Sequence, residues 1–158
     1  MPVTDRQVRV VSDPAGLAAC FAVRKAVFVD EQGVPADIEY DDHDADAVHV
    51  LAEGPEGPMG TGRLLLPGPA APHASAGSGA GTVGSLGRLA VTAAGRGRGI
   101  GAALVRAIEG AARARGLTAV DLHAQTHALG FYERLGYEAY GPEFPDAGIP
   151  HRAMRRTI

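Results

Sequence analysis

A glycine- and arginine-rich turn between an apolar strand and an apolar-periodic helix is the segment best suited to chemistry. Residues 88–104 read RLAVTAAGRGRGIGAAL. Glycines at 97, 99 and 101 let the backbone approach a ligand closely, and the unpaired amides at a helix start carry partial positive charge. Arg96 and Arg98 add guanidinium groups whose donors suit phosphate oxygens. The turn therefore predicts a diphosphate-binding site.

Two other phosphate-binding motifs fit this turn less well. A P-loop needs a lysine followed by serine or threonine after its last glycine, whereas residues 102–104 are Ala-Ala-Leu. A dinucleotide fingerprint is matched by Gly97, Gly99 and Ala102, with Asp121 about 20 residues further on. However, residues 92–96 separate the strand from the first of these glycines, and Asp121 lies inside an expected strand. Dinucleotide binding remains only a remote alternative.

The same turn, taken with a second motif, resembles one known family. Residues 96–101 match the (Q/R)-x-x-G-x-(G/A) signature of the GNAT N-acetyltransferase superfamily, and residues 88–91 resemble the strand that precedes it there. Residues 125–137, QTHALGFYERLGY, resemble the family's second block, although Gln125 stands where the family usually has Asn. Two motifs in the correct order, about 30 residues apart, are far more specific than either alone.

The ends of the chain resemble the ElaA-like branch of this family. Residues 24–32 resemble its R-x-x-V-F-(V/I)-x-E-Q segment, and residues 143–154 resemble its E-x-G-I-(P/A)-H-x-x-M ending. The resemblance spans nearly the whole chain and is patchy between residues 53 and 84. It implies one domain over residues 1–158 with an α/β (α+β) GNAT acyltransferase fold, in which helices flank a central mixed, mostly antiparallel, twisted sheet.

The resemblance also implies the ligand, an acyl-coenzyme A and foremost acetyl-CoA as co-substrate. Its pyrophosphate is expected on the amides of residues 96–102, its pantetheine arm along residues 89–91, and its thioester where that strand splays from residues 122–125. The residues expected to bind it are Leu89, Ala90, Val91, Arg96, Gly97, Arg98, Gly99, Ile100, Gly101, Ala102, Gln125 and Phe131.

Two residues are expected to move protons in the reaction. Acyl transfer to an amine needs a neutral amine, a polarised carbonyl and a proton for the departing thiolate. Tyr132 is the expected general acid, because the family's Phe-Tyr position carries that role in many members and a phenol is protonated at neutral pH. His151 is the favoured base, because its neighbourhood resembles the ElaA-like ending and histidine titrates near neutrality. The alternatives are a packing role for Tyr132 and a structural hydrogen bond for His151.

Other residues are candidates for the general base and for contacts with the substrate. Glu31, His43, His123 or an ordered water chain are alternative bases, and Phe28, Glu31 and Gln32 are expected to contact the substrate. Many relatives carry a glutamate just before the phosphate turn, where this chain has Leu86, Gly87 and Arg88. That difference motivates a second hypothesis, a non-catalytic acyl-CoA-binding or regulatory domain.

Composition bounds the setting and the partners. The chain has 158 residues, a formal charge of −3 and a single cysteine, so it excludes an internal disulfide and a cysteine-based zinc site, and we expect no metal. Because no long apolar run or signal peptide is present, we expect a cytoplasmic protein without membrane or nucleic-acid partners.

The acceptor is expected to be a small-molecule or peptide amine, and the sequence leaves open whether the chain forms a homodimer. The acidic stretch 37–46 suits a solvated turn or a lip for a cationic substrate.

Hydrophobic periodicity predicts an alternation of strands and helices. We expect a flexible loop over residues 67–84, which contain no apolar periodicity. The expected strands are 8–10, 48–52, 60–66, 85–91, 117–124 and 151–157, and the expected helices are 14–28, 101–115 and 128–135.

Overall fold

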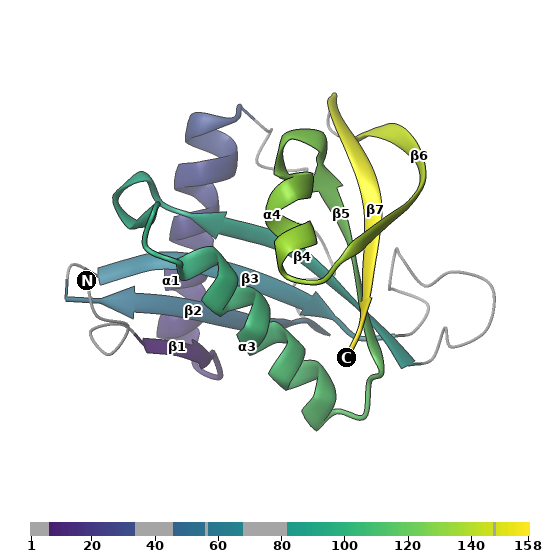
Figure 1. Ribbon diagram of the computed structural model, residues 1–158. Coiled ribbons are helices and arrows are strands. Elements are labelled where there is room, and N and C mark those ends of the chain that lie inside the picture. The colour runs from purple at the N-terminus through teal and green to yellow at the C-terminus, as the bar shows by residue number, and fades with distance from the viewer. Residues whose placement is uncertain (1–6, 34–45, 56, 68–81, 147) are drawn as a thin grey trace.

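The computed structural model describes residues 7–33, 46–55, 57–67, 82–146 and 148–158, and a seven-stranded sheet organises them (Figure 1). Strand order is β1-β2-β3-β4-β5-β7-β6, and every neighbouring pair is antiparallel except β4 and β5. The strands are β1 Gln7–Val10, β2 Val48–Gly54, β3 Gly57–Leu65, β4 Val83–Val91, β5 Ala119–Gln125, β6 Glu138–Asp146 and β7 Ile149–Thr157. The helices are α1 Pro14–Arg24, η2 Lys25–Glu31, η5 Ala93–Gly95, α3 Ile100–Ala114, η6 Thr126–Ala128 and α4 Leu129–Arg134.

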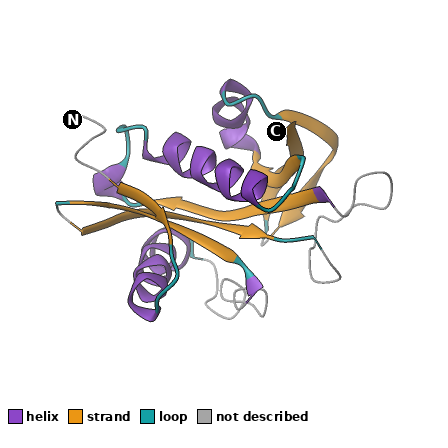
Figure 2. Cartoon of the chain, turned by 90° about the horizontal axis from the view of Figure 1, so that it is seen from below, coloured by secondary structure: helices purple, strands orange, loops and turns teal. Residues whose placement is uncertain are grey.

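Helices cover both faces of the sheet (Figure 2). Helix α3 lies on one face and α1 on the other, so the sheet is the middle of three layers. The mostly antiparallel mixed sheet confirms the expected fold class. Within the described residues, no helix is both long enough and apolar enough to span a bilayer.

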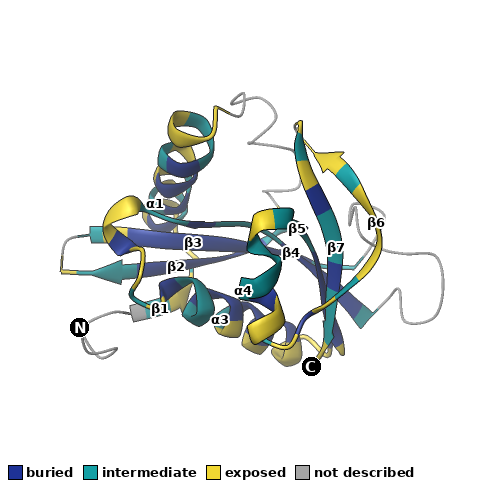
Figure 3. Ribbon diagram, turned by 45° about the horizontal axis from the view of Figure 1, so that its top comes forward, coloured by how far each residue is buried: buried dark blue, intermediate teal, exposed yellow. Residues whose placement is uncertain are grey.

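The two faces of the sheet differ in polarity because successive side chains of a strand point to opposite sides. Every second residue of β5, such as Val120 and Leu122, joins the apolar core beneath α3. The intervening Asp121 is fully buried on the other face. Arg24, His49, Arg63 and Ser85 are buried polar or charged residues outside the apolar core, and Figure 3 shows how deeply the central strands are buried. The face covered by α1 therefore has the polar interior that a reactive site needs.

Helix α3 follows directly from its apolar spacing. Ile100, Leu104, Val105 and Ile108 are buried at intervals of one helical turn, so one stripe packs on the sheet. The helix ends in a Schellman motif, in which the Leu117 amide donates to the Ala112 carbonyl at 3.0 Å. The expected helix over residues 101–115 is thus confirmed to within one residue at each end.

Three elements differ from the expected pattern. Strand β6 is not predicted by the sequence, because seven of its nine residues are exposed and no apolar alternation marks an edge strand of this kind. The helix that starts at Pro14 continues beyond Arg24 as the π-helix η2, whose widened turns carry the chain to Glu31. Strand β4 starts at Val83, inside the segment expected to be a loop, whereas residues 68–81 of that segment and 37–45 of the acidic stretch lie outside the described residues.

Gly110 inside α3 and Gly116 just after its C-cap provide a matched test of this backbone geometry. Gly110 has helical backbone inside α3, whereas Gly116 has φ of +78°, and an added Cβ meets nothing within 4 Å at either position. We expect Gly110→Ala to raise the free energy of unfolding by about 1 kcal/mol, because alanine is the better helix former. Gly116→Ala should lower it by about 1 kcal/mol or more, since the left-handed conformation costs an L-residue that much. Urea denaturation measures the free energy of unfolding of both variants. The same change in both would contradict the left-handed conformation at Gly116 and thus the C-terminal motif of α3.

Candidate active site

The site starts where strands β4 and β5 part. Their parallel pairing runs from Val83 and Ala119 to Leu86 and Leu122 and then ends. The opposite edge of β4 pairs with β3 and contains a β-bulge, because two residue steps along β3, from Thr61 to Arg63, span three along β4, from Ala90 to Gly87. Arg88 lies in this bulge and has a φ of 52°. A bulge bends its strand, so the second half of β4 follows β3 and leaves β5. The family resemblance implies that the two strands splay near residues 122–125. The end of the β4–β5 pairing at Leu122 confirms this.

A cavity of about 980 Å³ opens at this parting. Its walls come from η2, β3, β4, the start of α3, the end of β5, α4 and the β6–β7 hairpin. Most of the residues expected from the sequence line it: Phe28, Glu31, Gln32, Leu89, Ala90, Val91, Arg96, Ile100, Gly101, Gln125, Phe131, Tyr132 and His151. Gly97, Arg98, Gly99 and Ala102 do not line the cavity; they form the turn and first helical residues just beyond its end.

The turn before α3 has the backbone that an anion site requires. Gly97 and Gly99 have φ of +77° and +75°, which side chains other than glycine rarely adopt. The helix starts after Gly99 without a side-chain cap and without an acidic residue in its first turn. Its first amides are therefore available to a bound anion. Gly101 has a different role, since a Cβ there would lie 3.1 Å from Cζ of Phe131.

Polar contacts join η2 to both strands that part. The Arg96 guanidinium donates to the two carboxylate oxygens of Glu31 at 2.8 and 2.9 Å, and its Nε donates to the Val91 carbonyl at 3.1 Å. Gln125, at the end of β5, donates to the side chain of Gln32 at 3.2 Å. Two of the three predicted substrate residues, Glu31 in η2 and Gln32 just after it, therefore contact predicted cofactor residues. Arg96 can bind a phosphate only by sharing or releasing Glu31.

Tyr132 brings a protonated phenol to the cavity wall. It is 8% exposed, and its ring lies edge-on to Phe131 at 4.9 Å and to Tyr137 at 6.0 Å between centroids. Burial raises the pKa of the Tyr132 phenol well above its ordinary value, because the phenolate would be poorly solvated. Among the described residues its hydroxyl has no hydrogen-bond partner, so the hydroxyl is available to a ligand.

His151 is held in a defined orientation. Its Nδ1 lies 2.7 Å from the Ile149 carbonyl, which can only accept, so Nδ1 carries the proton in the neutral ring and Nε2 carries the lone pair. The Phe144 ring stacks against His151 at 27° and 6.1 Å, and it contacts His123 edge-on at 4.7 Å. Burial lowers the pKa of His123. His151 therefore has the geometry of a hydrogen-bond acceptor at the cavity wall.

Several cavity residues were missed from the sequence. Arg63, which is 4% exposed, lines the cavity from β3, and Ser85 lines it from β4. The alternate polar positions Thr61 and Arg63 of β3 are a sequence signal that could have indicated Arg63. Phe144 and Asp146 were missed because strand β6 was missed. Leu86, Gly87 and Arg88 line the cavity where many relatives carry a glutamate, and the candidate base His43 lies outside the described residues. Among those described, no three acidic, histidine or cysteine side chains gather as metal ligands would.

Comparison with known proteins decides which family shares this geometry. The family model described as acetyltransferase (GNAT) domain matches residues 72–158, and a Bacillus subtilis (strain 168) protein with a provisional acetyltransferase name is 36% identical over 152 residues, covering 94% of this chain and 95% of that protein. The chain belongs to the GNAT acetyltransferase family. It is an enzyme of that class, and acyl transfer with an acyl-CoA co-substrate is its general chemistry.

Solved structures of other GNAT proteins have the same fold. An acyl-CoA N-acyltransferase from Pseudomonas aeruginosa is 31% identical, has a TM-score of 0.77, and the match covers 97% of this chain and 99% of that one. Escherichia coli ElaA has a TM-score of 0.78 at 23% identity, covering 96% and 99% of the two chains, which shows the fold alone. For this GNAT enzyme, the family explains the turn before α3 better than a dinucleotide fingerprint does.

Proposed function

We propose that this enzyme transfers an acetyl group from acetyl-CoA directly to the primary amine of a small molecule or peptide in the cytoplasm, without a metal ion. The observation that carries the proposal is one cavity that reaches from the start of α3 to both Tyr132 and His151. An anion-binding turn at one end and two groups suited to proton transfer along the wall are what a CoA thioester and an amine require.

The cofactor would bind along the edge of β4 that β5 leaves. Its pyrophosphate would accept hydrogen bonds from the uncapped amides of residues 96–102, with Arg98 and Arg96 offsetting the charge. The pantetheine arm would pair with backbone groups of residues 89–91, which have no partner strand on that side among the described residues. Gln125 would flank the thioester end, whereas Phe131, whose ring lies beside Gly101, would contact the cofactor nearer its pyrophosphate.

In the reaction, the amine nitrogen attacks the thioester carbonyl carbon, forming the C–N bond as the C–S bond breaks. Nε2 of His151 accepts the proton that the amine loses. The Tyr132 hydroxyl donates a proton to the departing thiolate; a phenol carries that proton at neutral pH, and burial raises the pKa of Tyr132 further. Phe28, Glu31 and Gln32, on the η2 side of the cavity, would contact the amine acceptor.

Calorimetric titration with acetyl-CoA tests this proposal first, with NAD titrated in a parallel cell. We expect saturable binding of acetyl-CoA and none of NAD, since the turn has the uncapped helix start without the rest of a dinucleotide site. Thiol release from acetyl-CoA in the presence of a panel of primary amines should then identify turnover. Tight NAD binding without acetyl-CoA binding would contradict the proposal, and binding without turnover on any amine would favour a non-catalytic acyl-CoA-binding protein.

Replacing Tyr132 with Phe tests the general acid. The ring contacts with Phe131 and Tyr137 remain, so only the donated proton is lost. We expect kcat to fall by about 10²-fold, the usual contribution of a general acid, with an unchanged Kd for acetyl-CoA. Steady-state kinetics and calorimetry measure the two quantities, and an unchanged kcat would remove Tyr132 from this role.

Replacing His151 with Gln tests the base through its pH dependence. At neutral pH we expect kcat/KM to fall by about 10²-fold, because the acceptor enters the site largely as an ammonium ion. The deficit should shrink as the pH rises toward about 10.4, the ordinary pKa of a primary alkyl amine, because a growing fraction of the acceptor is then already neutral in solution. Wild-type enzyme and Tyr132→Phe, assayed over the same pH range, are the controls. A deficit of the same size at every pH would contradict the assignment.

A further inference from the structure

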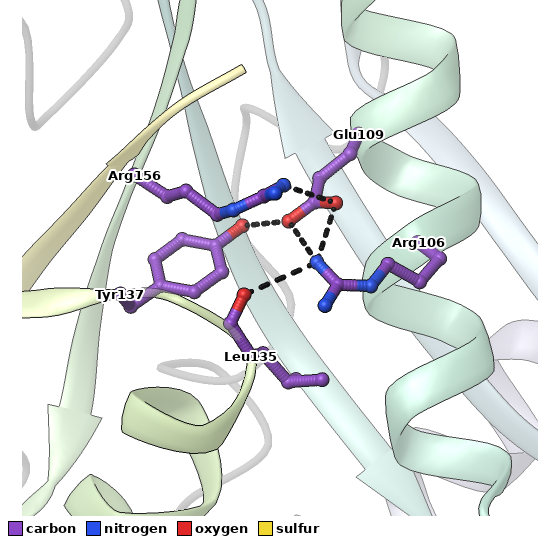
Figure 4. Close-up of polar contacts among 5 residues, drawn as sticks. All are labelled: Arg106, Glu109, Leu135, Tyr137 and Arg156. Carbon is purple, nitrogen blue, oxygen red and sulfur yellow. Dashed lines mark hydrogen bonds and ion pairs between the residues drawn. The ribbon is translucent and has the colours of Figure 1, made fainter.

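The carboxylate of Glu109 lies on α3, away from the cavity, and is only 1% exposed (Figure 4). It accepts hydrogen bonds from Arg106 and Arg156, each at 2.9 Å, and from the Tyr137 hydroxyl at 2.8 Å. The two guanidinium groups offset the buried charge, and the three donors come from α3, β7 and the residue just before β6. Glu109 is therefore the point at which three segments of the chain meet.

The Tyr137 end of this cluster reaches Tyr132 through the C-terminus of α4. The Gly136 amide donates to the Glu133 carbonyl and the Tyr137 amide to the Tyr132 carbonyl, each at 3.0 Å, which is a Schellman motif. In that motif the residue after the glycine packs against the residue whose carbonyl it bonds. The Tyr137 ring accordingly contacts the Tyr132 ring, at 6.0 Å between centroids and 74°.

A second contact holds the same helix end. Arg106 Nη1 donates to the Leu135 carbonyl at 3.2 Å while it also bonds Glu109 (Figure 4). The end of α4 is thus attached to the middle of α3 at two points, one through a side chain and one through the backbone. Because a helix is stiff over its length, these contacts fix α4 relative to the start of α3, where the pyrophosphate would lie.

We propose that Glu109 is a positioning residue, which acts through Tyr137 to hold the Tyr132 hydroxyl at one place relative to the acyl-CoA. The consequence for the reaction rests on the proposed function, in which Tyr132 is the general acid. The claim that Glu109 and Tyr137 fix the position of the Tyr132 hydroxyl does not rest on the proposed function. A displacement of the acid by a fraction of an ångström costs rate because proton transfer needs a defined distance and angle.

The other buried carboxylate cluster of the sheet is a natural control. Asp121 accepts a hydrogen bond from the Tyr140 hydroxyl and one from Arg155 at 3.0 Å, so it too joins one tyrosine and one arginine. It lies on the opposite face of the sheet from Val120 and Leu122, which pack in the core with Tyr132. Loss of the Tyr140 hydroxyl therefore removes the same kind of bond without touching Tyr132.

The experiment compares Tyr137→Phe with Tyr140→Phe in enzyme labelled with ¹³C at the ζ carbon of tyrosine. The chain has four tyrosines, so the Tyr132 resonance is assigned by its absence from Tyr132→Phe. We expect Tyr137→Phe to shift or broaden that resonance and to lower kcat by about tenfold with KM for acetyl-CoA little changed. Tyr140→Phe should leave the Tyr132 resonance and kcat as in wild type. Glu109→Gln, which keeps the side-chain shape, should change both readouts in the direction of Tyr137→Phe.

Two results would overturn the positioning role. One is an unmoved Tyr132 resonance in Tyr137→Phe, and the other is an equal loss of kcat in Tyr137→Phe and Tyr140→Phe, as general destabilisation would produce. Should Glu109→Gln fail to fold, the tyrosine pair alone decides, since each variant loses one hydroxyl only. If the wild-type enzyme transfers no acetyl group, the proposed function fails, and the Tyr132 resonance still decides whether Glu109 places the phenol.

Discussion

The parting of β4 from β5 is the constraint on which the rest of this site depends. Two parallel strands normally stay paired along their length, but here the bulge around Arg88 bends β4 toward β3, and the pairing ends at Leu86 and Leu122. The unpaired edge of β4 and the cavity beside it are consequences of that single irregularity. The start of α3 lines one part of the cavity, and η2 and Gln32 line another part, where Glu31 contacts Arg96 and Gln32 contacts Gln125.

Two buried carboxylates hold the C-terminal hairpin of β6 and β7 to the remainder of the sheet, one on each face. Glu109 pairs with Tyr137 and Arg156, and Asp121 pairs with Tyr140 and Arg155, so consecutive arginines of β7 serve opposite faces. Removing an arginine partner of such a buried carboxylate should destabilise the fold, because the charge would be less well compensated away from water. This hairpin carries His151 and Phe144, and the His151 ring is oriented by its own contact with the Ile149 carbonyl.

Sequence reasoning predicted most of the residues that line the cavity near the start of α3, and fewer of those that line it from β3 and β6. The turn at residues 96–101 and helix α3 are local structures, in which each requirement, a glycine at positive φ or an apolar residue every turn, concerns nearby residues. The residues that meet at the cavity from β3 and β6, such as Arg63 and Phe144, are set by strand pairing across long stretches of chain. The alternate polar positions of β3 are only a weak local signal for Arg63, and β6 itself was missed because it is an exposed edge strand.

By itself, the sequence determined the family, the mixed sheet with its flanking helices, the uncapped helix start suited to a phosphate, and the choice of Tyr132 and His151 as candidates. Tertiary structure decided what those candidates can do. Desolvation between Phe131 and Tyr137 keeps the Tyr132 phenol protonated, and the carbonyl of Ile149 places the lone pair of His151 on Nε2. Helix and turn formation depends on neighbouring residues, which a sequence displays directly. Burial, tautomer and the place of Glu109 depend on residues brought together only by folding, because each is a property of surroundings rather than of a residue type.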